Sequence, residues 1–362
     1  KGGKTGESLV EKGKDSPLHG KKIPWKYLFI PGVLLLVLAG LGLILRWFGH
    51  SEKPEANLAI RAGEVSGATT EATQYITPTE TSTPTEAPTL TATAAKVLMD
   101  TTGLQFDVNE KDQAEIVFIP AGEFLMGSDA AIDPYFWGAE SPSHTIFLDG
   151  YWIYRYEVTN KMYRDCVAAG KCPMPQQTYS RTRDEYYENP DYDDFPVIYM
   201  TYADAISYCK WAGGRLPTEA EWERAARGDT DSRTFPWGNT PATGSQANFC
   251  DRGCPAEVAD YNKNDGYRDT SPVGNYPEGM SPYGLFDVAG NVWEWVFDYY
   301  TPTYYRLSPE KNPRGPQYAT TRVMRGGGWN NPSIGVRVVQ RYGQIPNMGF
   351  DTLGFRCAIN AE

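Results

Sequence analysis

The sequence has little histidine, fewer basic than acidic residues, and almost no long apolar runs. Its three histidines are His19, His50 and His144, so only one falls in the globular part of the chain. With 34 Lys and Arg against 45 Asp and Glu, the net charge is -11. A nucleic-acid-binding domain needs a basic face, so we expect no nucleic-acid partner. The acidic balance weakly favours cation binding, although ordinary solvation of the surface is the simpler explanation.

The single long apolar run is Tyr27–Phe48, in which Arg46 is the only charged residue. As a helix it would measure about 33 Å, enough to span a bilayer. A signal peptide is the alternative, but the run is long for one, and no small-residue cleavage site follows promptly. Lysines are denser before the run than after it. We therefore expect a single-pass protein of the cell membrane with a cytoplasmic N-terminus and an extracytoplasmic C-terminal domain.

These features divide the chain into four segments. Residues 1–26 form a basic cytoplasmic segment, 27–48 the transmembrane helix, and 49–98 an extracellular stalk rich in Thr and Pro, which extends the chain because it cannot form a core. Residues 99–362 have a globular composition rich in Gly, Trp and Tyr. The sequence starts at Lys1 rather than Met, and a cytoplasmic domain before it belongs to one of the alternative hypotheses below.

Helix signals in the globular segment are clear. Three helices are predicted from capping residues: one follows Thr159 and ends near Gly170, one begins at Thr201 and stops at Gly213–Gly214, and one runs from the Thr218–Glu221 capping box to Gly228.

Strand signals are shorter and less regular. Apolar stretches at Ile116–Ile119 and Glu123–Met126, on either side of Pro120–Gly122, predict a β-hairpin. Further strands are predicted within Thr145–Tyr156 and near Arg322–Arg325, Arg337–Arg341 and Gly354–Ala358.

All six cysteines lie beyond the apolar run, and an even number in an exported domain predicts disulfides. Closeness in sequence pairs Cys166 with Cys172 and Cys250 with Cys254. That leaves Cys209 with Cys357, a bridge that would stabilise by roughly 4–5 kcal/mol on the chain-entropy model. A zinc site at the clustered cysteines is the alternative, but no histidine lies near them.

Seven segments together resemble the formylglycine-generating enzyme family, also called the sulfatase-modifying-factor family. The segments are Phe118–Ser128, Tyr156–Asn160, Gly214–Arg227, Phe235–Asn239, Tyr283–Trp295, Arg325–Asn330 and Leu353–Cys357. None is decisive alone, but they occur in the family's order over about residues 114–360. The resemblance implies an α+β fold related to C-type lectins, with little regular secondary structure, and it supports the Cys209–Cys357 bridge.

The resemblance also implies two structural calcium sites. One would use the side chains of Asn248 and Asp265 with the carbonyl oxygens of Phe249 and Tyr267. The other would use Asp287 and Glu294 with the carbonyl oxygens of Gly290 and Val292. Calcium takes six to eight oxygen ligands, and such a mixture of carboxylate, amide and carbonyl groups provides them. The alternative is a loop that these acids hold by hydrogen bonds without a metal.

The family's oxidase activity converts a sulfatase cysteine to formylglycine and depends on two cysteines that bind copper. Their positions correspond to about Asn331 and Val336 here, and no cysteine lies between Arg325 and Gly354. Thiolates suit Cu(I), so another residue does not easily replace them. A related branch uses iron held by histidines, which His144 alone cannot build. We therefore expect neither copper nor iron.

The favoured hypothesis is a non-catalytic module that presents the loop region Gly326–Asp351 as a recognition face. Its polar and aromatic contacts would come from Asn330, Asn331, Arg341, Tyr342, Gln344 and Asn347. The partner would be a protein, a glycan or a neighbouring subunit of a membrane complex. Two alternatives stay open: an enzyme of the same family with altered chemistry, and the sensor ectodomain of a larger signalling protein.

Overall fold

The computed structural model describes residues 98–99, 103–229 and 232–361. These residues belong to one compact unit, Pro88–Glu362, whereas the unit Lys1–Ala87 lies outside them. The predicted cytoplasmic segment, the transmembrane helix at 27–48 and the stalk up to residue 97 also fall outside the described residues. Within the described ranges, no helix is both long enough and apolar enough to cross a membrane.

The three helices begin where their caps predict. They are α2 (Asn160–Ala168), α3 (Tyr202–Trp211) and α4 (Glu219–Arg227). The Thr218 side chain accepts the backbone N–H of Glu221, whose carboxylate in turn accepts the N–H of Thr218. Thr159 and Thr201 cap their helices in the same way, through a hydroxyl that accepts the third N–H of the helix. These caps satisfy N–H groups that have no partner inside the helix.

The strands are short and form three sheets. They are β1 (Leu98–Met99), β2 (Gln105–Val108), β3 (Glu115–Ile119), β4 (Gly122–Met126), β5 (His144–Leu148), β6 (Tyr151–Tyr154), β7 (Trp293–Tyr299), β8 (Arg322–Arg325), β9 (Arg341–Gln344), β10 (Leu353–Phe355) and β11 (Ala358–Asn360). Their orders are β1-β2-β3-β6-β11, β10-β7-β8-β9 and β4-β5, and all pairs are antiparallel except β7 with β10. Short 3-10 helices lie between them: η1 (Gly138–Glu140), η2 (Pro190–Tyr192), η3 (Pro277–Gly279), η4 (Tyr304–Arg306) and η5 (Ser333–Val336).

Two strand predictions were wrong. Both strands of the predicted hairpin exist, but β3 pairs with β2 and β6, and β4 pairs with β5. The residues between β3 and β4 therefore carry the chain from one sheet to another instead of turning it back. The strand predicted over 337–341 begins only at Arg341, because residues 337–340 form a turn in which the Gln340 N–H donates to the Arg337 carbonyl at 3.0 Å.

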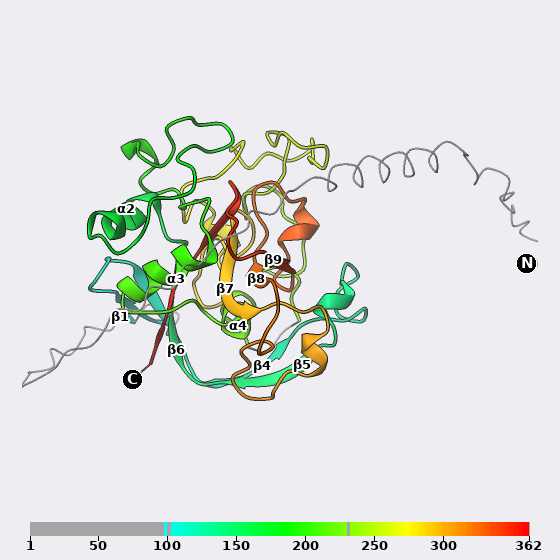
Figure 1. Ribbon diagram of the computed structural model, residues 1–362. Helices are drawn as coiled ribbons and strands as arrows, with labels where there is room; N and C mark the ends of the chain where they lie inside the picture. Colours follow the sequence, from blue (N-terminus) through cyan, green and yellow to red (C-terminus); the bar gives the residue numbers. More distant parts are fainter. Residues whose placement is uncertain (1–97, 100–102, 230–231, 362) are drawn as a thin grey trace, which may run out of the picture. The chain divides into compact units, whose positions relative to one another are not determined.

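Strand β7 went unpredicted although it is central in its sheet. Five of its seven residues are buried, so it lacks the alternation that marks a half-buried strand. Figure 1 shows β7, β8 and β9 side by side in the middle of the domain, with α2 and α3 on one side and β4 and β5 on another. Helix α4 packs against β4, β7 and β8, where Trp222 lies fully buried.

All six cysteines form the three predicted disulfides. Cys166 bonds to Cys172, Cys250 to Cys254, and Cys209 to Cys357. The last bridge joins α3 to the residue that precedes β11, across 148 positions of sequence. Since no cysteine remains free, the zinc alternative is wrong.

Candidate recognition site and cation-binding loops

The predicted recognition face is centred on β9 and the loop after it, where Tyr342 is half exposed. The Tyr342 ring lies 6.4 Å from that of Trp137 and 6.3 Å from that of Trp293, measured between centroids. Asn330 and Asn347 are exposed, and Asn331 and Gln344 are partly so. These residues expose neutral amide groups and aromatic carbon at the surface.

Arg341 does not belong to this face. Its side chain is 2% exposed and forms two charge-assisted bonds with Glu219, from Nε to Oε1 at 2.6 Å and from Nη2 to Oε2 at 2.8 Å. A further nitrogen, Nη1, donates to the carbonyls of Ala139 and Thr301. In β9 successive side chains point to opposite faces, so Arg341 points inward while Tyr342 points out. The prediction that Arg341 contacts a partner is therefore wrong.

Arg341 is part of a buried group of charges, which we call the acid–base core. Its members are Glu219, Glu223, Arg227, Arg325 and Arg341. Arg325 Nη2 lies 2.6 Å from Glu223 Oε2, and Arg227 Nη2 lies 3.1 Å from Glu223 Oε1. Burial alone would raise the pKa of Glu219, but Arg341 and Arg325 outweigh burial and hold that pKa below its ordinary value. The core thus fixes α4 to β8 and β9 beneath the recognition face.

Six exposed apolar residues, which the sequence analysis did not single out, lie in the predicted recognition region or beside Tyr342; together we call them the exposed apolar surface. They are Trp137, Ile334, Tyr342, Ile345, Met348 and Phe350, each of which is at least 36% exposed. Four of the six follow one another along the chain over 342–350, and the Trp137 ring lies against that of Tyr342. Single exposed apolar residues are common, whereas several together mark a contact site. In sequence these residues look like ordinary loop residues, so only their common exposure identifies them.

The two positions that correspond to the family's copper-binding cysteines have structural roles here. Asn331 closes a turn: its Oδ1 accepts the N–H of Gly328 and its N–H donates to the carbonyl of Gly328, each at 2.9 Å. Its carbonyl accepts the N–H of Cys250 at 2.8 Å. Val336 is fully buried. Neither position offers a thiol, and all six cysteines are in disulfides.

The residues of the first predicted calcium site lie together in one buried loop region. Asp265 is 8% exposed, and its two carboxylate oxygens accept the N–H groups of Phe249 and Tyr267, each at 2.9 Å. Burial, with Asp251 nearby, raises the pKa of Asp265 to about 7. Its carboxylate forms no ion pair with a described residue. A buried carboxylate without a balancing charge is a group that a hard cation can take as a ligand, and its oxygens here accept backbone N–H groups.

The second predicted calcium site fits less completely. Asp287 is buried and accepts the N–H of Gly274 at 2.6 Å, and burial raises its pKa to about 6. The loop from Asp287 to Asn291 has positive φ at both of these residues, which turns its peptide groups unusually. Glu294, however, is already neutralised by Arg356, with bonds of 2.7 and 2.8 Å. Asp287 would therefore provide the unbalanced charge at this site.

No group of three or more His, Cys, Asp or Glu side chains in the described part of the chain has the arrangement of a metal site. Each calcium site above would rely on one or two carboxylates and otherwise on amide and carbonyl oxygens. Asn248, Asp265 and the Phe249 and Tyr267 carbonyls would hold the first ion, and Asp287 with the Gly290 and Val292 carbonyls the second. Bound calcium would cross-link loops that have little regular structure.

We expect the thermal stability of the chelator-treated protein to fall as the pH rises from about 4 to about 7. Over this range the unfolded chain loses the Asp265 proton near its ordinary pKa, whereas the folded chain keeps it until about pH 7. The stability contributed by the protonated group is complete below the unfolded pKa and is lost as the pH passes the folded pKa. Bound calcium would hold the carboxylate ionised, so on the calcium hypothesis millimolar calcium should raise the Tm at pH 7.5 and flatten this profile. Calorimetry with EDTA and with calcium measures both, and Asp265→Asn should remove the calcium response.

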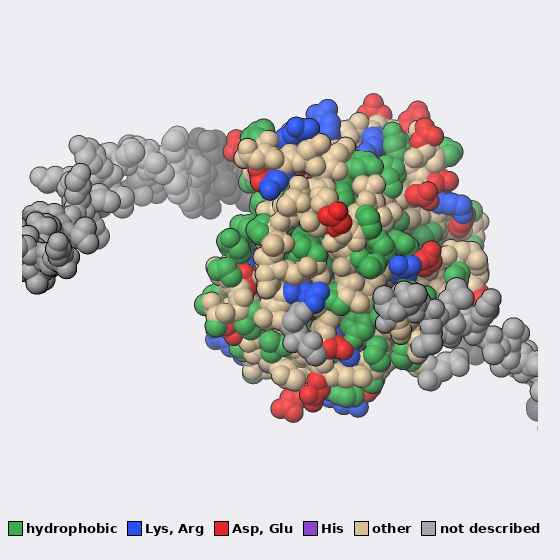
Figure 2. Space-filling model, turned by 180° about the vertical axis from the view of Figure 1, so that it is seen from behind, with side chains coloured by type: hydrophobic (Ala, Val, Ile, Leu, Met, Phe, Trp, Pro, Cys, Tyr) green, Lys and Arg blue, Asp and Glu red, His purple; other side chains and the backbone are tan. Residues whose placement is uncertain are grey.

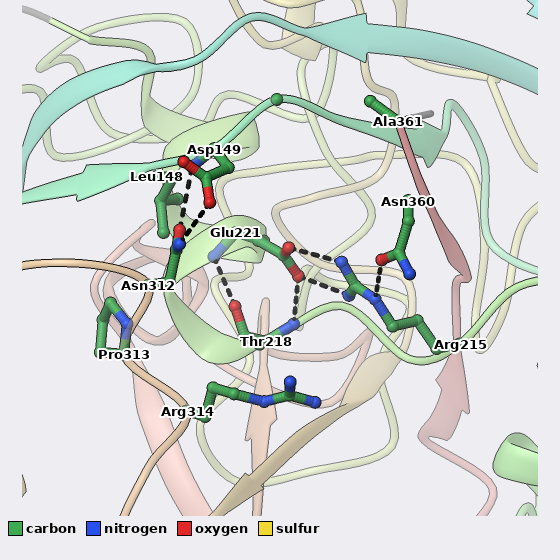
Figure 3. Close-up of a pocket in the computed structure, with 11 residues that line it drawn as sticks. Leu148, Asp149, Arg215, Thr218, Glu221, Asn312, Pro313, Arg314, Asn360 and Ala361 are labelled. Atoms are coloured by element: carbon green, nitrogen blue, oxygen red, sulfur yellow. Dashed lines mark hydrogen bonds and ion pairs between the residues drawn. The ribbon is translucent and has the colours of Figure 1, made fainter.

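A pocket of the domain has a lining that includes none of the predicted recognition residues. It measures about 500 Å³, and its lining includes Asp149, Arg215, Glu221, Asn312, Arg314 and Asn360. Figure 3 shows Arg215 between Glu221 and Asn360, and Asn312 against Asp149, so most polar groups of the lining are paired with one another. We assign this pocket no ligand, because most of its polar side chains already bond to one another, and Arg314 alone among its charged residues has no polar partner in the described part of the chain.

The surface carries no broad patch of one charge on the face that Figure 2 shows. Lys and Arg are interspersed with Asp and Glu, and hydrophobic side chains reach the surface in several places. This arrangement offers no continuous basic track for a phosphate backbone.

Comparison with known proteins agrees with the geometry. Residues 103–361 match the model of the sulfatase-modifying factor enzyme 1-like domain. The chain is 33% identical over 288 residues to the formylglycine-generating enzyme of Streptomyces coelicolor, covering 68% of this chain and 89% of that protein. It is 30% identical over 289 residues to the mouse protein named inactive C-alpha-formylglycine-generating enzyme 2, covering 68% and 86%.

A solved structure is also similar. The structure of PvdO from Pseudomonas aeruginosa superimposes with a TM-score of 0.58 at 28% identity, covering 71% of this chain and 98% of that one. The mixed helix and strand content, the order of motifs and the match over residues 103–361 agree with one another. The chain belongs to the formylglycine-generating enzyme family, with a sulfatase-modifying-factor-like domain over these residues.

Proposed function

We propose that the domain is a non-catalytic recognition module that binds a protein partner through its exposed apolar surface. The observation that carries this proposal is that all six cysteines are in disulfides, and that no cysteine lies between Arg325 and Gly354, where the resemblance places the family's copper-binding pair at about Asn331 and Val336. Formylglycine formation in this family needs two thiolates at one metal. Without them the scaffold keeps its shape but lacks the group that activates oxygen.

The surface around Tyr342 supports protein recognition in particular. Aromatic and aliphatic side chains, with neutral amides beside them, form the usual centre of a protein interface. Trp and Tyr are the residues whose loss most often weakens such interfaces, because each buries a large rigid area. Trp137 and Tyr342 lie in contact and are both exposed, so we assign them as the anchors.

One relative supports the proposal that this chain keeps the family scaffold without the oxidase activity. The mouse protein that this chain matches over 86% of its length is named inactive. This likeness supports a family scaffold used for a purpose other than oxidation. Placement on a membrane by residues 27–48, with the domain outside, would present the surface to partners in the same compartment.

We expect Trp137→Ala and Tyr342→Ala each to weaken partner binding at least tenfold without changing the Tm appreciably. A photoreactive amino acid at position 342, in the full chain on native cells, should cross-link a protein partner. The same amino acid at Tyr318, which is 75% exposed and outside the surface, provides the matched control. Equal yields at both positions would place the interface elsewhere.

The similarity to active enzymes of the family motivates a second candidate, an oxidoreductase with a different metal site. The two candidates separate in one assay. The purified full chain is loaded with copper or iron, analysed for bound metal, and incubated with a sulfatase peptide under oxygen. We expect calcium alone to remain bound in stoichiometric amount, and the peptide thiol to remain unchanged. Aldehyde formation with stoichiometric copper or iron would contradict the non-catalytic proposal.

A further inference from the structure

The Cys250–Cys254 disulfide lies directly beneath the turn that carries Asn330 and Asn331. The Cys250 N–H donates to the Asn331 carbonyl at 2.8 Å. Both sulfur-bearing residues pack against Trp329 in a small buried cluster, with Ala256 and Ala259 at its edge. The Cys250 carbonyl accepts the N–H of Asp260 at 3.0 Å, so one residue links the turn to a second loop. Cys250, one end of the bridge, therefore contacts two loops at the base of the recognition region.

The three disulfides differ in how firmly the fold holds them. Cys209–Cys357 joins positions 148 apart, and Cys166–Cys172 belongs to the main core cluster together with α2 and α3. Cys250–Cys254 spans only four positions and belongs to a cluster of three buried residues among loops. A bridge that closes a short loop constrains the unfolded chain least. Regions with few buried apolar neighbours open locally at the lowest free energy.

We propose that Cys250–Cys254 is a site of thiol–disulfide exchange that takes a dithiol as its reactant. Within this bridge Cys254 is 7% exposed and Cys250 is fully buried, so the incoming thiolate attacks the Cys254 sulfur. Cys172 is exposed to the same small extent, 8%, so the pair is distinguished by its small loop cluster and not by its exposure. That step forms a mixed disulfide and releases the Cys250 thiolate. The second thiol of the reactant then attacks the mixed disulfide and releases the Cys254 thiolate. Both protein thiolates take up the protons that the dithiol gives up. The protein disulfide is thereby reduced by two electrons, and the dithiol is oxidised to a disulfide.

Reduction of this bridge acts on the recognition region through Trp329 and Asn331. Once the sulfurs separate, the loop from Cys250 to Cys254 no longer holds Cys250 against Asn331, and the Gly328–Asn331 turn loses one of its supports. The exchange site and its chemistry do not depend on the proposed recognition role. Only the effect on partner binding rests on that proposal.

The test is graded reduction of the full folded chain with dithiothreitol, followed by alkylation and mass spectrometry. We expect Cys250 and Cys254 to carry the label first, at a dithiol concentration at which the other four cysteines remain unlabelled and the circular dichroism spectrum is unchanged. Indole fluorescence provides a second readout, because a disulfide in contact with an excited indole quenches it. Emission should rise with the labelling of this pair, and Trp329→Phe should abolish the rise.

Two double variants complete the test. Cys250→Ser/Cys254→Ser should remove both the early labelling and the rise in fluorescence, whereas Cys166→Ser/Cys172→Ser, the other short bridge, should leave both unchanged. Hydrogen exchange of the 328–331 amides should be faster by at least tenfold in the first variant than in the unmodified chain. Labelling of Cys166 and Cys172 before this pair, or opening of all three bridges only on unfolding, would overturn the proposal. Neither result bears on whether the exposed apolar surface binds a partner.

Discussion

Replacing Arg341 by alanine is expected to lower the free energy of unfolding by about 3–5 kcal/mol. The substitution removes the positive charge that pairs with Glu219 and leaves that carboxylate buried with only Arg325, at 3.4 Å, and the Tyr305 hydroxyl, at 3.1 Å, beside it. Burial would then raise the Glu219 pKa, since Arg341 is the main group that lowers it. Urea unfolding followed by tryptophan fluorescence measures the loss. Replacing a residue of an exposed face by alanine would lower the free energy of unfolding very little.

Two further variants separate a lost pair from a lost charge. Replacing both partners, Glu219→Leu with Arg341→Met, should recover much of the stability, because no unpaired charge remains in the core. Arg314→Ala is the matched control: Arg314 is exposed, contacts the ring of Phe297, and forms no hydrogen bond or ion pair with a described residue. Its effect should stay within about 0.5 kcal/mol. If Arg341→Ala behaved like Arg314→Ala while partner binding fell, Arg341 would belong to the recognition face.

Arg341 also shows why the recognition face was only partly predictable. A sequence places Arg341 and Tyr342 in one polar segment, and both residue types are common in interfaces. Which of the two points outward depends on the register of β9 with β8, where Arg341 is opposite Arg325. That register is fixed by Glu219 and Glu223 on α4, more than 100 positions earlier in the chain. No local pattern contains this information.

Local sequence signals, in contrast, were sufficient to predict the helices and two of the disulfide bridges. Thr218 and Glu221 satisfy each other's backbone groups within four residues, so the start of α4 can be read directly from the sequence. Cys166 and Cys250 each have a partner within six positions. The hairpin prediction failed because the pairing of β4 is not local. Its partner is β5, which begins 18 positions beyond the end of β4, and no residue near Gly122 indicates that pairing.

The residues of the calcium loops could be predicted from the sequence only in part. The resemblance indicated Asp265 and Asp287 by their motifs, and the structure shows both buried without a neutralising partner of their own. It did not indicate that Glu294 would be taken by Arg356, because that pair joins β7 to a residue between β10 and β11. A motif therefore carries the identity of possible ligands, but the charge balance around each ligand depends on distant residues.

Removal of the Cys209–Cys357 bridge should cost more than removal of any other bridge. Replacing both cysteines by alanine opens a loop that spans 148 positions. On the chain-entropy model, closing that loop stabilises the fold by about 5 kcal/mol, whereas closing the six positions between Cys166 and Cys172 stabilises it by about 2 kcal/mol. Both bridges lie in the same core cluster, so the side-chain volume lost from the core is equal for the two double variants. The difference between their unfolding free energies therefore isolates the contribution of loop length. Urea unfolding under non-reducing conditions measures it.

The position of the long bridge predicts which region loses order when it is absent. Cys357 lies between β10, which pairs with β7, and β11, which pairs with β6, so its partner on α3 holds two sheets to one helix. Without the bridge, amide exchange should accelerate first in β10 and β11, while α4 and the acid–base core keep their protection because they contact β8 and β9. If equal stability losses were found for the two bridges, the entropy of loop closure would not be the source of the stabilisation. Enthalpic effects in the shared core cluster would then explain both bridges.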